Sequence, residues 1–286
     1  MTSQIEDESE NFGFDEHLAQ AFAAQAAATL ERARLQLEAQ RAAELRRELE
    51  MARSIQRSFL PEQTPAIPGY ELAAWWQPAE FVSGDYYDWF PLPDQRLSLV
   101  VGDVSGHGVH SSLIMASIRA MLRIVAKTTS EPARILDLLD EAIHGDLRDA
   151  RFVSFLMVAL DPATHHVKFA NAGHAPAVHI SRRFATVHPL AATRLPLGFP
   201  NVPVPVALTE FQMEPADLLV LGTDGVIEAR NPAGELFGLP RLLDLLQKNS
   251  ERTADELVQL VCQAVQAFHA QLLPADDTTL MILKRT

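Results

Sequence analysis

The chain has 286 residues, of which 48% are hydrophobic and 21% charged, so it can bury a sizeable core in one large or two modest domains. Its formal net charge of −13 argues against nonspecific nucleic-acid binding, because phosphates repel an acidic surface. We expect no membrane span, no signal peptide and, with Cys262 as the single cysteine, no intrachain disulfide framework. These features together predict a cytoplasmic protein.

The first 60 residues have the composition of a tail followed by a long helix. Residues 1–17 carry six acidic side chains and no Lys or Arg, which predicts a disordered acidic tail. Residues 18–60 contain no glycine or proline and are rich in strong helix formers. A heptad-like apolar seam runs through Ala42, Leu45, Leu49, Ala52 and Phe59. It predicts a regulatory helix that either pairs in a homodimeric coiled coil or packs on the next domain, with an upstream sensor protein as its input.

The third segment, residues 61–286, has the sequence pattern of an α+β domain. Three prolines and a glycine between Leu60 and Gly69 end the helix. Short apolar runs then predict strands over 97–102, 152–160, 167–173 and 217–222 and at the C-terminus. Helices are expected over about 109–127, 132–148, 239–248 and 254–270, the last opening with a capping box at Thr253. The clustering of strands favours antiparallel sheets with helices packed outside.

Aspartates at the ends of these strands are the candidate functional residues. Asp103 follows the run LSLVV, Asp224 follows LLVLG, and Asp276 and Asp277 precede the final strand. Asp85 lies in VSGDYYDW, a segment rich in strand formers. Each position taken alone is better explained by ordinary turn chemistry, because Asp and Gly are common turn residues.

Taken together, these aspartates favour a metal site. Carboxylates that converge from rigid strand ends repel one another unless a cation compensates their charge. Ligation by oxygen alone selects Mg²⁺ or Mn²⁺ over zinc. Two such ions activate water for in-line displacement at phosphorus. Neither a G-x-S-x-G elbow nor a phosphate-binding G-x-x-x-x-G-K-[ST] loop is present, so metal-assisted hydrolysis is the expected chemistry.

Seven motifs resemble, in order, those of the SpoIIE/RsbU-like phosphatases, the bacterial branch of the PPM metal-dependent serine/threonine phosphatases. They are VSGDYYDW, VVGDVSGHGV, NAGHAPAV, LPLGF, GTDGVIEARN, LFGLPRL and ADDTTLMIL. The segment ELEMARSIQRSFLP before them is similar to the helical lead-in of that branch, so the resemblance covers about residues 45–286. Two departures occur: Ser83 replaces a glycine of the usual GGDYYD, and His110-Ser111 stands where proline and alanine are common.

The resemblance implies a four-layer α-β-β-α sandwich after the long N-terminal helix, with two Mn²⁺ or Mg²⁺ ions between the sheets. It implies that Asp103 bridges both ions, that the Val104 carbonyl binds one, and that Asp224 and the terminal pair complete the shell. Asp276 matches the family pattern better than Asp277. Asp85 is implied as an additional, regulated ligand, and the helices before and after GDVSGHG as movable.

The resemblance further implies a cytoplasmic protein serine/threonine phosphatase, a phosphoric monoester hydrolase, with Asp103 and Asp224 as its catalytic residues. The implied substrate is a phosphorylated STAS-domain protein, an anti-sigma-factor antagonist in a signalling pathway. The alternative is a catalytically silent phosphatase-like module that binds a partner. His107 is a candidate general acid, although hydrogen bonds within loops explain His107 and His174 better.

Overall fold

The computed structural model describes residues 2–143, 145, 147, 151–183, 185–199, 209–270, 272 and 274–286, with side chains from residue 20 onward. The chain divides into two compact units, Met1–Met51 and Ala52–Thr286. Over the residues so described, no helix is both long enough and apolar enough to cross a membrane.

The first unit is helical throughout its described residues. Helix α1 runs over Thr2–Arg57, so residues 2–17 are helical where the sequence predicts a disordered tail. No proline precedes Pro61, and the single glycine of this stretch, Gly13, costs only about 1 kcal/mol inside a helix. Two exposed i,i+4 ion pairs, Arg34–Glu38 and Arg46–Glu50, each add about 0.3–0.5 kcal/mol. The coiled-coil dimer stays a prediction.

The last turns of α1 belong to the second unit, which begins at Ala52 and not at the predicted residue 61. Gln56 supplies the physical reason, because its side chain is only 4% exposed. Its Nε2 donates to the Ser83 carbonyl oxygen at 2.6 Å, and the Ser83 N–H donates to its Oε1 at 2.9 Å. These two bonds and the buried side chain of Leu60 attach the end of α1 to the domain that follows.

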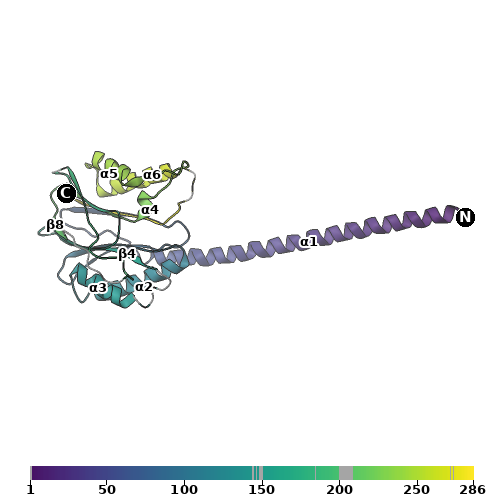
Figure 1. Cartoon of the computed structure of the whole chain (residues 1–286), viewed down its shortest axis with the longest axis horizontal. Helices are drawn as coiled ribbons and strands as arrows, with labels where there is room; N and C mark the ends of the chain where they lie inside the picture. The colour runs from purple at the N-terminus through teal and green to yellow at the C-terminus, as the bar shows by residue number, and fades with distance from the viewer. Residues whose placement is uncertain are drawn as a thin grey trace. The chain divides into compact units, whose positions relative to one another are not determined.

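Two five-stranded antiparallel sheets form the centre of the second unit (Figure 1). The first sheet has the order β1-β10-β9-β6-β7, with β1 (Tyr70–Gln77), β10 (Thr278–Arg285), β9 (Leu218–Gly222), β6 (Ala177–Ser181) and β7 (Thr186–Pro189). The second has the order β2-β3-β4-β5-β8, with β2 (Asp85–Pro91), β3 (Leu97–Val104), β4 (Val153–Asp161), β5 (His166–Ala172) and β8 (Glu210–Gln212).

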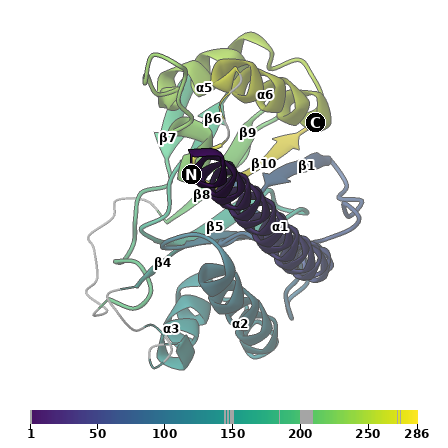
Figure 2. The ribbon, with the colours of Figure 1, turned by 90° about the vertical axis from the view of Figure 1, so that its right-hand side faces the viewer.

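Helices cover the outer face of each sheet, as Figure 2 shows. The second sheet is covered by α2 (Val109–Val125) and α3 (Pro132–Ile143), and the first by α5 (Gly238–Lys248) and α6 (Ala254–His269). A short helix, α4 (Asp224–Ile227), follows β9. The predicted α-β-β-α sandwich is thus confirmed. Helix α3 ends at Ile143, and positions 144, 146 and 148 of the helix predicted over 132–148 lie outside the described residues.

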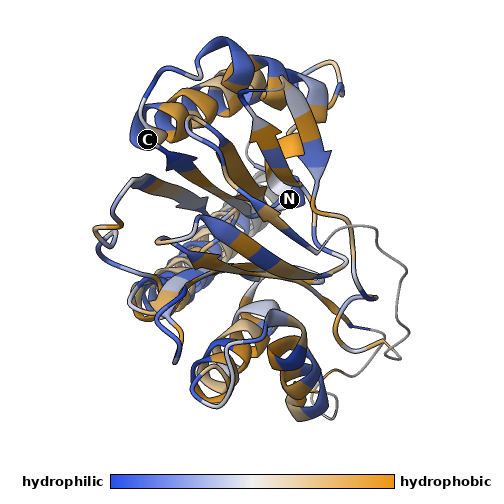
Figure 3. Cartoon of the chain, turned by 90° about the vertical axis from the view of Figure 1, so that its left-hand side faces the viewer, coloured by the Kyte–Doolittle hydropathy of each residue, from blue (hydrophilic) through white to orange (hydrophobic). Residues whose placement is uncertain are grey.

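Alternate residues of the central strands face different hydrophobic cores. In β10, Leu280 and Ile282 pack with the residues of α5 and α6, whereas Met281 and Leu283 pack between the two sheets. Successive side chains of a strand point to opposite faces, so a strand covered on both faces is apolar throughout. This explains the uninterrupted apolar runs in the sequence, and Figure 3 shows hydrophobic residues along the strands between the layers.

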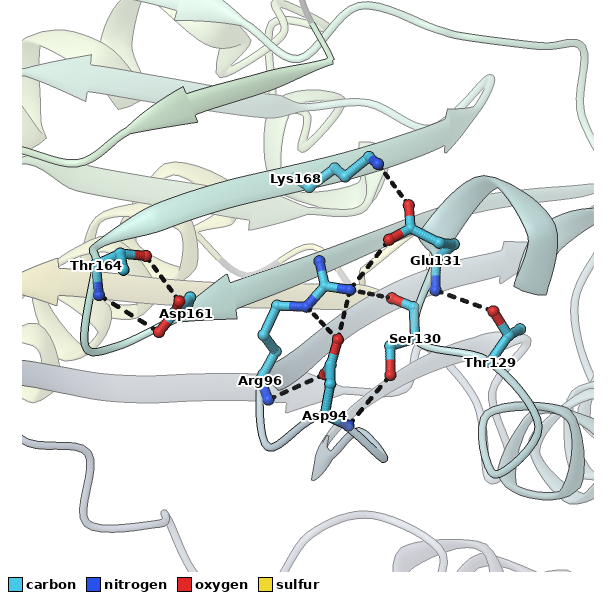
Figure 4. A network of polar contacts seen from close by, with 8 residues as sticks. All are labelled: Asp94, Arg96, Thr129, Ser130, Glu131, Asp161, Thr164 and Lys168. Atoms are coloured by element: carbon cyan, nitrogen blue, oxygen red, sulfur yellow. Dashed lines mark hydrogen bonds and ion pairs between the residues drawn. The ribbon is translucent and has the colours of Figure 1, made fainter.

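A polar network fastens the connection between α2 and α3 to the second sheet (Figure 4). Arg96 donates to Asp94 through Nε at 2.8 Å and to the Ser130 carbonyl oxygen at 3.0 Å. Glu131 accepts from both Arg96 and Lys168, which lies on β5. The network leaves α2 anchored at its C-terminal end.

Gly102 on β3 provides a test of the packing between the sheets. A Cβ at this position would lie 2.4 Å from a ring carbon of Phe155. Gly102→Ala is therefore expected to destabilise the second unit by about 1–3 kcal/mol, which lowers Tm by about 2–4 °C per kcal/mol in a domain of this size. Gly145→Ala is the control, since no heavy atom lies within 4 Å of the added Cβ. Equal melting temperatures for the two variants in calorimetry would contradict the packing.

Candidate metal centre

One end of the sandwich collects the predicted aspartates from both sheets. Asp85 begins β2 and pairs directly with Asp103 near the end of β3 in the antiparallel register. Asp224 is the first residue of α4, immediately after β9. Asp276 and Asp277 immediately precede β10. Because β9 and β10 are antiparallel neighbours, the end of one lies beside the start of the other. The strand register therefore brings these aspartates to the same end of the sandwich.

Asp85 links the two sheets through its carboxylate. Its Oδ2 accepts hydrogen bonds from the hydroxyls of Thr223 and Thr279, each at 2.7 Å. The side chain is 1% exposed, and burial, followed by the charges of Asp103 and Asp277, holds its pKa well above the usual range. The two threonine hydroxyls oppose this shift by stabilising the charged form. Asp85 is thus fixed by the protein itself.

The terminal pair divides into a buried and an exposed carboxylate. Asp277 is 3% exposed, and its two oxygens accept from the backbone N–H groups of Ala79 and Gly84, each at 2.8 Å. Asp276 is exposed, and its Oδ1 accepts from the Asp277 N–H at 2.8 Å. Asp277 is therefore occupied in holding the backbone, whereas Asp276 is accessible to an ion. This arrangement supports Asp276 as the ligand of the pair.

Asp103 lies among carboxylates whose charges repel its own. Burial first, and then the charges of Asp224, Asp276 and Asp277, together raise its pKa from 3.8 to about 7. The pKa of Asp224 is also raised, first by burial and then by Asp276 and Glu228. Every charged group that shifts Asp103 is acidic, so a divalent cation is the species that this arrangement lacks.

Close backbone approaches hold the site together. A Cβ on Gly84 would lie 2.9 Å from the Val104 carbonyl oxygen, and one on Gly225 would lie 2.0 Å from the Asp277 carbonyl oxygen. Glycine is required at both positions for these segments to pack. Ser83, which departs from the family pattern, is fully buried, and its Oγ accepts from the Asp85 N–H at 3.0 Å. The departure is therefore accommodated without displacing Asp85.

The donor set has the composition of a hard-cation site, although its members are spread apart. Over the described ranges, no three His, Cys, Asp or Glu side chains already stand in a metal-holding cluster. The carboxylates are nonetheless near enough to raise the pKa of Asp103 and Asp85. An oxygen-only set of this kind fits Mg²⁺ or Mn²⁺.

The hydrogen bonds and ion pairs of the two candidate histidines, among the described residues, are with residues other than these carboxylates. His107 is exposed, and its Nδ1 lies 3.0 Å from Glu80 Oε1. His174 is 3% exposed, and its Nδ1 lies 2.7 Å from Ser154 Oγ. Burial lowers the pKa of His174 to about 4, so this side chain is neutral at pH 7. Both contacts are with loop or strand neighbours, and a general-acid role for His107 stays a prediction.

Three supporting residues escaped the sequence reasoning. Thr223 and Thr279 hold Asp85, and Gln56 holds the backbone of Ser83. Each threonine stands beside or close to an aspartate, in GTDG and DDTT, and Gln56 falls on the heptad seam seven residues after Leu49. The sequence shows that each threonine is close to an aspartate and that Gln56 occupies a heptad position. Neither feature identifies the residue that the side chain contacts.

The sequence model of stage II sporulation protein E (SpoIIE) matches residues 93–286. The chain belongs to the SpoIIE family. Among its relatives, protein IcfG of Synechocystis is 29% identical over 271 residues, and phosphoserine phosphatase RsbU of Bacillus subtilis is 27% identical over 242 residues. The match covers 84% of this chain and 42% of IcfG, and 85% of this chain and 71% of RsbU.

Solved structures confirm the fold of this SpoIIE-family chain. The PP2C domain of SiaA from Pseudomonas aeruginosa superposes with a TM-score of 0.74 at 23% identity, covering 85% of this chain and 97% of that domain. The RsbU and RsbW domains of Rv1364c from Mycobacterium tuberculosis superpose with a TM-score of 0.63 at 26% identity, covering 77% and 61%. The SpoIIE/RsbU-like resemblance carried by the seven motifs is confirmed.

The raised pKa of Asp103 predicts how the metal-free protein responds to pH. Its ordinary value of 3.8 in the unfolded chain rises to about 7 in the folded chain. Between these values the folded state keeps a proton that the unfolded state has lost, so the free energy of unfolding falls as pH rises from about 4 to about 7. Thermal melts in a chelating buffer measure this fall, and added Mn²⁺ should reverse it.

Asp103→Asn should flatten that pH dependence and raise the metal-free Tm at pH 7.5 by roughly several degrees, because it removes one repelling charge. Asp244→Asn, which alters an exposed carboxylate on α5, is the control and should leave the slope unchanged. A wild-type Tm that is constant or increases across this pH range would refute the electrostatic account.

Proposed function

We propose that the chain is a metal-dependent protein serine/threonine phosphatase that hydrolyses phosphomonoesters with two Mn²⁺ or Mg²⁺ ions. The observation that carries the proposal is the uncompensated group of carboxylates around Asp103 at one end of a PP2C-like sandwich. Bound ions would supply an activated water for in-line attack and neutralise the phosphate oxygens. Asp103, Asp224 and Asp276, with the Val104 carbonyl, are the proposed ligands.

The remaining residues of the site act as supports in this proposal. Thr223 and Thr279 fix the orientation of Asp85, so that this carboxylate faces the site from a rigid position. Asp277 holds the backbone of Ala79 and Gly84 and so keeps the β2 end of the site closed against β10. Asp85 would then act as an additional ligand or water-holder whose position is sensitive to its neighbours.

The substrate and setting are inferred from the relatives. RsbU and RsbP of Bacillus subtilis are named phosphoserine phosphatases, and a structure from the bacterial stressosome also superposes on this chain. We accordingly propose a phosphorylated STAS-domain protein as substrate, in a cytoplasmic pathway that controls a sigma factor. Homodimerisation through α1 and an input from a separate sensor protein complete the proposal.

Substitution of the proposed ligands tests the assignment. Asp224→Asn and Asp276→Asn should each reduce Mn²⁺-dependent release of phosphate from an aryl phosphate by more than the about 10–100-fold that loss of an outer-shell partner costs. Asp277→Asn should instead lower Tm, because an amide NH₂ would face one of the backbone N–H donors and cost about 1–3 kcal/mol.

Asp244→Asn is the matched control and should retain turnover. Unchanged turnover in Asp224→Asn would contradict the phosphatase assignment. Isothermal titration with Mn²⁺ distinguishes the phosphatase from the alternative, because a catalytically silent binding module should bind the ion weakly or not at all.

Truncation tests the proposed regulation by α1. Removing residues 1–51 leaves the second unit intact, whereas removing residues 1–56 also deletes Gln56 and its two bonds to Ser83. We expect the first deletion to abolish dimerisation and the second to change the turnover rate of the aryl phosphate as well. Size-exclusion chromatography with light scattering and steady-state assays measure both. If neither deletion changes oligomeric state or rate, α1 is only a spacer.

A further inference from the structure

Helix α2 and the turn that follows it carry a stripe of basic residues that the proposed chemistry does not use. Arg119 and Arg123 lie one turn apart on α2, and Lys127 follows four residues later, in the turn after the helix ends at Val125. Together with Phe90, Pro91 and Ala126 they line a hollow of about 480 Å³. None of these lining residues is acidic, although the whole chain has a net charge of −13.

Two of the three cations are held in fixed positions. Arg123 donates from Nε and a terminal nitrogen to the two oxygens of Asp88, at 2.8 and 2.6 Å, and its guanidinium lies 4.5 Å from the centroid of the Phe90 ring. Arg119 donates from Nε to the Phe59 carbonyl oxygen at 2.8 Å and lies 5.0 Å from the centroid of the Phe59 ring. Side chains held in this way lose little further entropy when they bind.

The stripe keeps a net positive charge. The fully buried carboxylate of Asp88 balances the charge of Arg123. Arg119 is paired with a neutral carbonyl oxygen, and Lys127 is exposed. Within the described part of the chain, no ion pair links either of these two residues to a carboxylate. About two charges therefore remain for an anionic partner.

An exposed apolar ridge adjoins the stripe on the same helix. Val109, Leu113 and Ile124 are 49%, 64% and 67% exposed. Helical periodicity places them on one side of α2, next to the basic stripe. A small oxyanion would use only the cations, whereas a protein segment would cover both the cations and the ridge. The combination favours a protein partner.

We propose that this face of α2 is a docking site for an acidic segment of the phosphorylated protein substrate. The inference rests on the proposed phosphatase function. Cations four residues apart on a helix are about 6 Å apart, and alternate residues of an extended peptide are about 6.6 Å apart. A segment with Asp or Glu at alternate positions thus matches the stripe. Arg119 lies about 15 Å along the helix from Val109, which follows the Asp103 loop, so one small protein reaches both places.

Direct binding tests the proposal with the full, Mn²⁺-loaded chain. The probe is a fluorescein-labelled peptide with aspartate at alternate positions, and its asparagine counterpart is the reference. Fluorescence anisotropy should show tighter binding of the aspartate peptide, weakened about three- to tenfold by Arg119→Gln and by Lys127→Gln. Arg134→Gln, which removes an exposed cation on the neighbouring helix α3, is the control and should change Kd by less than about twofold. Arg123 is left intact, because its loss would strand the buried Asp88 carboxylate.

Three results would overturn the proposal. The first is equal peptide affinity in wild type and both variants. The second is displacement of the peptide by an equal concentration of inorganic phosphate, which would indicate a small-oxyanion site. The third is a change of oligomeric state in the variants with unchanged peptide affinity, which would indicate an interface between copies.

Turnover of a phosphoserine peptide that carries the aspartate segment separates this proposal from the phosphatase assignment. Docking predicts that the two variants raise KM for this peptide and leave kcat unchanged. If the peptide is not hydrolysed at all, the phosphatase assignment fails, and anisotropy still decides the docking site.

Discussion

The crowding of like charges at one end of the sandwich is the constraint on which the rest of the structure depends. Strand register forces Asp85 and Asp103 to face each other, and burial makes their ionisation costly. The carboxylates respond to this cost of ionisation in two ways. Asp85 and Asp277 accept hydrogen bonds from hydroxyl or backbone donors, which oppose the rise of their pKa values, whereas burial and neighbouring charges all raise the pKa of Asp103. The division separates carboxylates that organise the site from carboxylates that need a cation.

The same hydrogen bonds connect the helix before the domain with both sheets. Gln56 holds the backbone of Ser83, the Ser83 hydroxyl accepts from the Asp85 N–H, and the Asp85 carboxylate accepts from Thr279 on β10. A displacement at the end of α1 would therefore strain a bond adjacent to the metal centre. Such continuity is a physical condition for coupling between the end of α1 and the site. It does explain why a buried glutamine occupies a seam that is otherwise apolar.

The sequence predicted long strands that are buried on both faces and missed the shortest strands and the contacts made by residues far along the chain. Strand β10 was predictable because its apolar run serves two cores. Strands β7 and β8, of four and three residues, are too short for any periodicity to appear. The choice between Asp276 and Asp277 depends on the N–H groups of Ala79 and Gly84, which are more than 190 residues away. Spacing cannot reveal such donors.

The opposite charges of the two functional surfaces are compatible because of their separation. At physiological ionic strength the Debye length is about 8 Å, so the carboxylate cluster is largely screened at the about 15 Å that separates Val109 from Arg119 along α2. A negatively charged partner would thus meet local attraction at the basic stripe even though the whole chain is acidic. In the proposed arrangement, α2 begins directly after the Asp103 loop, and Arg96 and Glu131 hold the connection that follows the helix, so that α2 would fix the distance between the docking site and the metal site. Specificity of this kind requires no contact at the phosphoryl group, which every phosphomonoester shares.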